Sequence, residues 1–302
     1  FAVSATGGAH LCSIQYYLRF WLGICRTSLA VSALRIMRYC PISAISKSNL
    51  KEFPMIQAVT TPAHKQAFAT AIQGAPYFRA VMGRDLALWA DNPGAPVRLF
   101  TLPGAALTLN GSTAQLCGTP QDWEELLSFL QFAGIAHLIA EETPLLPAAA
   151  GEPLFLYSMP PQDRLPLAQE HQGYMLNRSP SVLRLATQLF PQEPERQDCY
   201  YSETCTALAH GFARVLALQD AAGRPVSTVG AYAMANGEAY MAMGETLPEL
   251  RGRGIGGWLI PYLANELAGE GWTVTFLCAA ERCRFYERLG FVLQKQYVKY
   301  KL

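Results

Sequence analysis

Apolar residues in the second half of the chain form short runs that end at turn-forming residues, a pattern that predicts β-strands. Asn236 and Gly237 separate two such runs and predict a two-residue hairpin turn. A glycine-rich turn and a long apolar stretch of helical character follow before the next strand. The predicted strands are 212–219, 226–235, 238–244 and 273–280. Several strands combined with one long helix indicate an α+β fold.

The same order of elements is predicted in the first half of the chain. Asn110 and Gly111 predict a hairpin turn, and a helix is expected to begin at Thr119. The predicted strands are 97–102, 105–109, 113–117 and 135–140. We therefore expect two α+β domains, 55–150 and 151–302. The first is either a degenerate copy of the second or an unrelated, smaller α+β domain.

The segment between the two repeated regions combines a linker with helix-forming sequence. The linker is predicted at 143–152, because that stretch is rich in Pro, Ala and Gly. Residues 153–159 predict a strand. Residues 164–190 and 195–210 favour helices, with a break near Pro180.

The first 54 residues differ in charge from the remainder. Residues 1–54 carry six Lys or Arg and one acid, a net charge of +5, whereas the remainder has 18 bases and 22 acids, a net charge of −4. Arg19 and Arg26 interrupt the apolar stretch 14–34, which therefore contains no run of about 18 apolar residues that could span a bilayer. We expect 1–54 to be a leader or read-through segment before a start at Met55, and an organelle transit peptide stays open.

The overall composition disfavours several classes of partner. The 302 residues are 51% hydrophobic and carry a net charge of +1, so a sizeable core is expected and a general field for nucleic acid is not. Eight cysteines lie scattered without a CxxC pair or a matching His spacing, which predicts no metal site and a reducing compartment, here the cytoplasm. Neither nucleic acid nor a membrane is expected as a partner, and the oligomeric state stays open.

The most informative candidate for chemistry is the turn 251–257, RGRGIGG, which precedes the long apolar helix. Backbone N–H groups at a helix start can converge on an anion, helped by the positive end of the helix dipole. The turn lacks the GKS or GKT ending of a Walker A loop. It also fits GxGxxG, but the strand 272–280 lacks the acid expected of a dinucleotide-binding unit, which makes a dehydrogenase a distant alternative.

Two motifs together resemble the GNAT family of acyl-CoA-dependent N-acyltransferases. Arg251, Gly254 and Gly256 match the Arg/Gln-x-x-Gly-x-Gly/Ala pattern, and residues 285–291, FYERLGF, follow the next strand. The resemblance covers about 152–302. It implies a mixed sheet flanked by helices, and transfer of an acetyl group from acetyl-CoA to a primary amine of a small molecule or peptide.

The resemblance also assigns cofactor-binding residues. Backbone amides of the turn would hold the CoA pyrophosphate, and main-chain groups of the preceding strand would meet the pantetheine arm. The residues concerned are Glu245, Thr246, Arg251, Gly252, Arg253, Gly254, Ile255, Gly256 and Gly257.

The candidate catalytic residues follow from the same resemblance. Tyr286 matches the position whose phenol protonates the departing thiolate. The position of the general base on the strand before the turn falls on Tyr240, and Glu238 lies on the same face of that strand. Glu245 is nearer the reacting centre, but the alternation of the strand turns its side chain to the other face unless a β-bulge intervenes. Ala279 stands where many members have a cofactor-binding Asn. Because no residue stands out as the base and the cofactor-binding Asn is absent, a non-catalytic acyl-CoA sensor stays open as the alternative.

The corresponding helix start in the first half has a different character. Thr119 is predicted as its N-cap, Pro120 as its first residue and Asp122 as part of a capping box. Asp122, Glu124 and Glu125 would place negative charge where a pyrophosphate would lie. One acyl-CoA site, in the second half, is therefore expected.

Overall fold

The computed structural model of the protein describes residues 56–146, 151–167 and 173–302. The chain divides into two units, Phe1–Phe53 and Pro54–Leu302, and the second contains all of these described residues. The predicted leader, 1–54, lies outside the described residues, so the fold reported below is that of the second unit.

Among these described residues, the strands form one mixed sheet in the order β1-β2-β3-β4-β5-β12-β6-β11-β10-β9-β8-β7. The strands of the first half are β1 (Gln57–Ala58), β2 (Val97–Leu102), β3 (Ala105–Asn110), β4 (Thr113–Gly118), β5 (His137–Ala140) and β6 (Gly151–Met159). Those of the second half are β7 (Met175–Asn177), β8 (Arg214–Gln219), β9 (Pro225–Ala235), β10 (Glu238–Thr246), β11 (Thr273–Ala279) and β12 (Val292–Lys301). The mixed α+β sheet flanked by helices confirms the predicted fold class.

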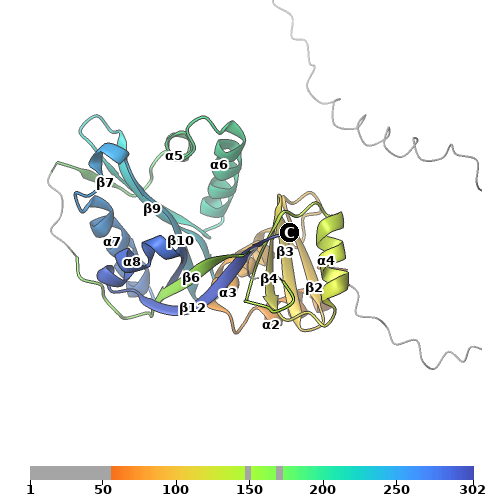
Figure 1. The fold of residues 1–302 in the computed structure, drawn as a ribbon. Helices are drawn as coiled ribbons and strands as arrows, with labels where there is room; N and C mark the ends of the chain where they lie inside the picture. Colours follow the sequence, from red (N-terminus) through yellow and green to blue (C-terminus); the bar gives the residue numbers. More distant parts are fainter. Residues whose placement is uncertain (1–55, 147–150, 168–172) are drawn as a thin grey trace, which may run out of the picture. The chain divides into compact units, whose positions relative to one another are not determined.

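The helices are distributed between the same two halves (Figure 1). The first half contains α2 (Pro62–Ala71), α3 (Pro76–Trp89) and α4 (Trp123–Phe132). The second contains α5 (Val182–Leu189), α6 (Pro194–Ala209), α7 (Ile255–Gly269) and α8 (Cys283–Leu289), with 3-10 turns at Pro248–Leu250 and Ala280–Arg282. No helix of the described segments is long and apolar enough to cross a membrane.

The two halves repeat one order of elements. In each, a short edge strand is followed by two helices, three antiparallel strands, a helix, a strand parallel to the third, and a last long strand. The second half has one additional helix, α8, before its last strand. In the first half, Thr113–Gln115 pairs in parallel with His137–Ile139. In the second, Glu238–Tyr240 pairs in parallel with Thr273–Thr275. Each parallel pair spans three residues beside a hairpin turn, which supports a duplicated arrangement.

The last strand of each half joins the sheet of the other half. β6, the last strand of the first half, pairs with β11 and β12. β12, the last strand of the second half, pairs with β5 and β6. Figure 1 shows β6 and β12 side by side where the two halves meet. The sheet is therefore continuous across the predicted linker at 143–152.

An aromatic cluster joins α3 of the first half to the strands of the second. The Tyr77 ring lies 5.2 Å from the Tyr240 ring, and the Phe78 ring lies 5.2 Å from the Tyr297 ring in an edge-on contact. Beside them, the Arg79 guanidinium forms an ion pair with Glu238, whose side chain is 2% exposed. Because α3 also packs on β9 and β11, this cluster makes one core from both halves.

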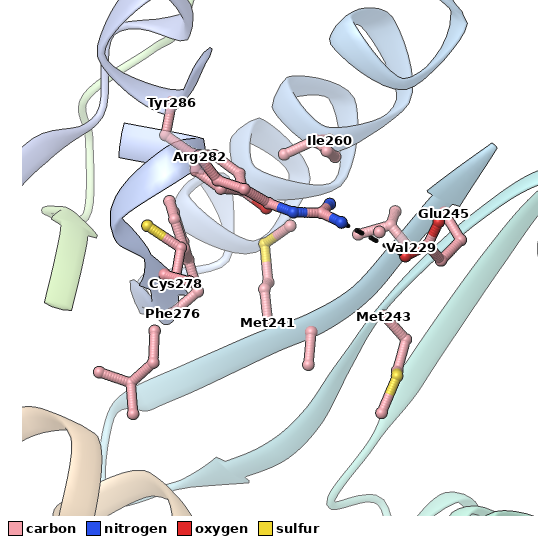
Figure 2. A pocket seen from close by; sticks show the side chains of 13 residues that line it. Val229, Met241, Met243, Glu245, Ile260, Phe276, Cys278, Arg282 and Tyr286 are labelled. Carbon is pink, nitrogen blue, oxygen red and sulfur yellow. Dashed lines mark ion pairs between the residues drawn. The ribbon is translucent and has the colours of Figure 1, made fainter. Parts of the chain in front are cut away.

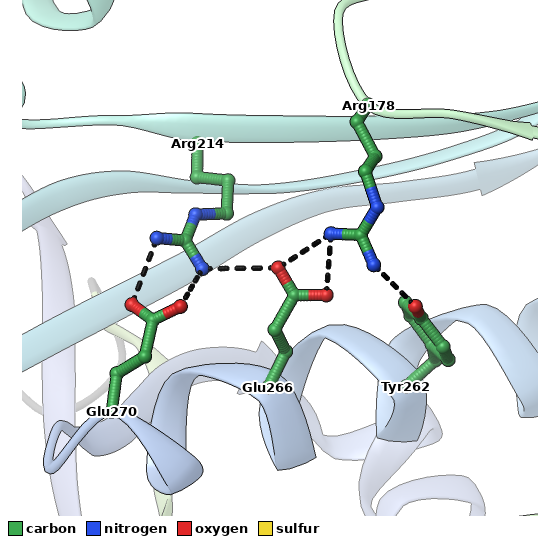
Figure 3. A network of polar contacts seen from close by, with 5 residues as sticks. All are labelled: Arg178, Arg214, Tyr262, Glu266 and Glu270. Atoms are coloured by element: carbon green, nitrogen blue, oxygen red, sulfur yellow. Dashed lines mark hydrogen bonds and ion pairs between the residues drawn. The ribbon is translucent and has the colours of Figure 1, made fainter.

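An ion-pair network fixes α7 to the edge of the sheet (Figure 3). Arg214 of β8 donates to Glu270 at 2.7 and 2.8 Å and to Glu266 at 3.1 Å. Arg178, just after β7, donates to Glu266 at 2.7 and 2.8 Å and to the Tyr262 hydroxyl at 2.5 Å. Shared use of one carboxylate by two guanidinium groups makes the network stronger than isolated surface pairs.

Two of the predicted elements differ from the structure here, and a third is confirmed. Residues 164–167 and 173–178 contain no helix; Met175–Asn177 instead forms β7, because pairing with β8 outweighs local propensity. The first hairpin turn is Gly111–Ser112, one residue later than predicted, since Asn110 pairs with Thr113. The predicted turn at Asn236 and Gly237 is confirmed, with φ of +52° and +79°.

Candidate functional site

β10 and β11 separate beyond their short parallel pairing and leave a pocket between them. The last paired residues are Tyr240 and Thr275. A pocket of about 240 Å³, here called the splay pocket, opens where the strands diverge (Figure 2). Its lining includes Val229, Met241, Met243, Glu245, Ile260, Phe276, Cys278, Ala279, Arg282 and Tyr286. Apolar side chains form its wall, and Glu245, Arg282 and Tyr286 are its titratable groups apart from the buried Cys278.

A second pocket, of about 550 Å³, lies over the glycine turn and is here called the glycine-turn pocket. Its lining includes Thr246, Arg251, Gly252, Gly254, Ile255, Gly256, Gly257, Arg282, Tyr286 and Arg288. It shares Glu245, Arg282 and Tyr286 with the splay pocket. A ligand could therefore extend from the turn into the gap between the strands.

The start of α7 leaves its backbone amides without a side-chain cap. Gly254 is the N-cap residue, with φ of +80°, and no side chain bonds to the first turn. This left-handed conformation favours glycine. A Cβ on Gly256 would lie 3.1 Å from the Thr246 hydroxyl, so the backbone comes close to β10 there. Uncapped N–H groups and the helix dipole together suit an anion.

The side chains of Arg251, Arg253 and Ile255 in the glycine turn point to different surroundings. The Arg251 side chain folds back onto β10, where Nε donates to the Thr246 carbonyl at 3.0 Å and Nη2 to Glu245 Oε2 at 3.2 Å. Arg253 is exposed, whereas the Ile255 side chain is buried in the core beneath α7. The turn therefore offers guanidinium groups to solvent while an apolar residue anchors it.

A β-bulge sets the direction of Glu245. The segment Ala242–Glu245 of β10 lies opposite Thr228–Gly230 of β9, so β10 contains one extra residue. Met243 within the bulge has φ of +53°. The extra residue reverses the alternation and brings Glu245 to the face of Tyr240. Sequence analysis left open whether a bulge precedes Glu245, and the structure shows that β10 contains one.

Glu245 lies among positive charges at the mouth of the splay pocket. Besides its contact with Arg251, it approaches Arg282 Nη2 at 3.9 Å (Figure 2). Arg282 was missed from the sequence, because only the fold brings the turn after β11 across the gap to β10. Its guanidinium links the two pockets, where it suits an anionic or developing negative charge.

Tyr286 lines both pockets, as the FYERLGF motif implies. Its ring lies 4.3 Å from that of Phe276 and 5.1 Å from that of Phe285. Burial is the main cause that raises the pKa of the Tyr286 phenol, and Arg282 opposes this shift. The hydroxyl therefore stays protonated at neutral pH and can act as a proton donor.

The position of Tyr240 does not suit the predicted role of base. Its ring packs against Tyr77 and lines neither pocket. Burial raises the pKa of Tyr240 to about 12, which disfavours the phenolate that could accept a proton. Glu238 is likewise occupied by Arg79 in the core. Of the predicted catalytic residues, Glu245 and Tyr286 line both pockets, whereas Tyr240 lines neither.

The motif helix, α8, makes a further polar contact with the sheet. Glu287 accepts a hydrogen bond of 2.9 Å from the hydroxyl of Tyr157, which is fully buried on β6. The contact fixes α8 against the sheet next to Tyr286. No local pattern could reveal it, since the two partners are far apart in the chain.

The equivalent helix start in the first half is closed to anions. The N-cap of α4 is Asp122, not Thr119, and its carboxylate accepts from the Glu125 amide at 2.9 Å. Helix α4 therefore begins at Trp123, after Pro120. An aspartate caps a helix as well as a threonine does, and Glu124 and Glu125 add negative charge. The helix start is therefore capped and acidic as predicted, but the N-cap residue is Asp122 and not Thr119.

The described residues contain no group of three or more His, Cys, Asp or Glu side chains placed to bind a metal ion.

Comparisons with known proteins bear on the family and the fold. Residues 211–293 match the family model described as an acetyltransferase (GNAT) domain. A comparison with curated protein sequences finds no significant match. Solved structures share the fold at low identity, as follows.

A tandem GNAT protein from the clavulanic acid biosynthesis pathway is 16% identical, with a TM-score of 0.55 over 82% of this chain and 97% of its own. A GCN5-related N-acetyltransferase from Sphaerobacter thermophilus is 15% identical, with a TM-score of 0.56 over 82% and 95%. A Drosophila protein from a structural genomics programme is 13% identical, with a TM-score of 0.57 over 82% and 98%. Residues 211–293 thus match the GNAT acetyltransferase domain model, and the chain shares its fold with GNAT proteins, including a tandem one.

Proposed function

We propose that the protein transfers an acetyl group from acetyl-CoA to a primary amine of a small molecule or peptide. The observation that supports this most is the uncapped glycine turn, whose pocket continues into the gap between β10 and β11. A turn that served only for packing would not need to open onto such a gap.

The residues present fit a CoA thioester. Amides of Gly254, Gly256 and Gly257 would hold the pyrophosphate, with Arg251 and Arg282 as nearby countercharges. Acetyl-CoA would supply an acyl group that is activated as a thioester. Apolar side chains of the splay pocket would exclude water from the reacting atoms.

The proposed reaction is a direct transfer in a ternary complex. The acceptor nitrogen attacks the thioester carbonyl carbon, so a C–N bond forms and the C–S bond breaks. The amine loses a proton, either to Glu245 or to solvent, and Tyr286 donates a proton to the leaving sulfur. Solvent then returns a proton to Tyr286. Aliphatic ammonium groups have a pKa of about 10, so deprotonation must precede attack.

A second candidate is an acyl-CoA sensor without turnover. It is favoured by the ion pairs of Glu245, which is the only carboxylate in the described part of the splay pocket's lining, and by Ala279 in the place of the family's Asn. Release of CoA thiol with any of a panel of amines supports the enzyme. Tight acetyl-CoA binding without thiol release across the panel supports the sensor.

Gly254→Glu tests the proposed pyrophosphate site. We expect acetyl-CoA affinity to fall by roughly 100-fold, because the carboxylate would repel the pyrophosphate at the helix start. Calorimetric titration measures the affinity. Gly254→Gln is the matched control, since it has the same length and the same strain at φ of +80° without the charge. Equal affinities of the two variants would refute the assignment of the turn.

A further inference from the structure

A third pocket, of about 410 Å³, lies between β10 and the α5–α6 connection and is here called the α5–α6 pocket. It shares Met243 and Glu245 with the splay pocket. These two residues belong to the bulged part of β10, so the bulge forms the boundary between the pockets. An amine in the α5–α6 pocket would approach the reacting centre past Glu245.

The wall of the α5–α6 pocket is mainly apolar. Leu189, Phe190, Pro191, Met243, Leu247 and Pro248 line it. The loop that supplies this wall is fixed, because Gln197 Nε2 donates to the Phe190 carbonyl at 2.8 Å. Such a surface favours an acceptor with an apolar side chain.

The α5–α6 pocket has more basic than acidic residues in its lining. Among the described residues that line it, Arg196 and Arg251 are basic and Glu245 is the only acid. The Arg196 guanidinium lies over the Phe190 ring at 4.3 Å and pairs with Glu193 at 2.7 Å. The pair is largely exposed, with side chains 60% and 47% accessible, so Arg196 can also reach a ligand anion at low cost. One acid and an additional guanidinium suit a ligand with one ammonium and one carboxylate.

We propose that the acceptor is an α-amino acid with an apolar side chain. Its ammonium would lie beside Glu245, its carboxylate would bind Arg196, and its side chain would pack on Phe190 and Met243. This inference rests on the proposed function and uses the same reaction, in which the α-nitrogen forms the C–N bond as the C–S bond breaks. A polyamine would leave its second ammonium facing guanidinium groups, which costs binding energy.

The test compares L-leucine with 3-methylbutan-1-amine, which is leucine without its carboxylate. We expect kcat/KM to be about tenfold higher for L-leucine, since one charge-assisted contact differs. Arg196→Gln should bring the ratio near one, because the carboxylate of L-leucine loses its guanidinium partner. Arg184→Gln, an exposed substitution on α5 that lies outside the α5–α6 pocket, is the matched control and should keep the ratio. An unchanged ratio in Arg196→Gln, or a preference for 1,4-diaminobutane over L-leucine, would overturn the inference.

Binding without turnover gives an independent readout. L-Leucine should bind the CoA-saturated protein in a calorimetric titration, and Arg196→Gln should weaken that binding about tenfold. If CoA binds and L-leucine does not, the acceptor inference is wrong while the proposed function stands. If CoA itself does not bind, the proposed function fails.

Discussion

The hydroxyl of Tyr286 lies in an aromatic environment that favours its neutral form. Phe276 and Phe285 surround the ring, and burial is the leading cause of the raised pKa. Because the pKa lies above its ordinary value of 10.0, the protonated form persists through neutral and mildly alkaline pH. A proton donor of this kind is lost only as pH rises through the raised pKa.

Replacement of Tyr286 by Phe should therefore affect chemistry rather than binding. We expect kcat to fall about 100-fold, because the leaving sulfur loses its proton donor, whereas the ring contacts remain. Thiol release measures kcat, and calorimetry should give an unchanged affinity for acetyl-CoA. In the unaltered enzyme, kcat should show no alkaline decline below about pH 9. An unchanged kcat in Tyr286→Phe would make Tyr286 a packing residue only.

At the scale of the element, the bulge of β10 directs Glu245 and separates two pockets at Met243. Met243 has φ of +53° and a 39% exposed side chain, so its backbone is strained and its burial is small. A glycine adopts the same conformation without the clash of a Cβ.

Met243→Gly should leave the free energy of unfolding unchanged or raise it by up to about 1 kcal/mol. The acceptor KM should increase, because the substitution removes part of the apolar wall. Urea unfolding and steady-state kinetics provide the two measurements. Met241→Gly is the contrasting control: that side chain is 3% exposed, and its loss should cost about 3 kcal/mol. A similar cost at both positions would contradict the strain at Met243.

Local sequence signals predicted the elements that depend on local physics. The turn at Asn236 and Gly237 was predictable because both residues accept a left-handed conformation. The glycine turn before α7 and the position of Tyr286 followed from the resemblance to the two GNAT motifs. The bulge, the Arg282 contact and strand β7 depend on pairing between distant segments, and no local pattern contains that information.

At the scale of the whole molecule, one buried ion pair links the halves through their shared core. Arg79 of α3 pairs with Glu238 of β10. Burial raises the pKa of Glu238, and the attraction of Arg79 opposes the shift. A carboxyl group with a raised pKa contributes stability at low pH that is lost as pH rises through that pKa.

Arg79→Ala should destabilise the fold by about 3 kcal/mol at pH 8, because Glu238 would remain buried without its partner. The pKa of Glu238 would rise further, so the loss should be smaller at pH 5 than at pH 8. Urea unfolding at the two pH values measures this dependence. The double variant Arg79→Met and Glu238→Leu is the control and should recover most of the stability. A loss that is equal at both pH values would show that the ion pair is not the cause.

The exchange of β6 and β12 predicts that the first half does not fold alone. A fragment of residues 54–159 keeps β6 but lacks β12, which supplies the buried residues Tyr297, Val298 and Tyr300 to its cores. We expect the fragment to show no cooperative urea transition and no near-ultraviolet circular dichroism, whereas residues 54–302 should show both. A cooperative transition in the fragment would mean that β12 is dispensable.

The same exchange has a consequence for synthesis on the ribosome. Strand β5 ends at Ala140, but its neighbour β12 begins only at Val292. The edge of β5 must therefore stay unpaired while the whole acyltransferase-like half is being translated. An exposed strand edge can recruit other nascent chains. The completion of the first half and the assembly of the proposed active site thus become a single late event, and chaperones that cover strand edges should influence the yield of active protein.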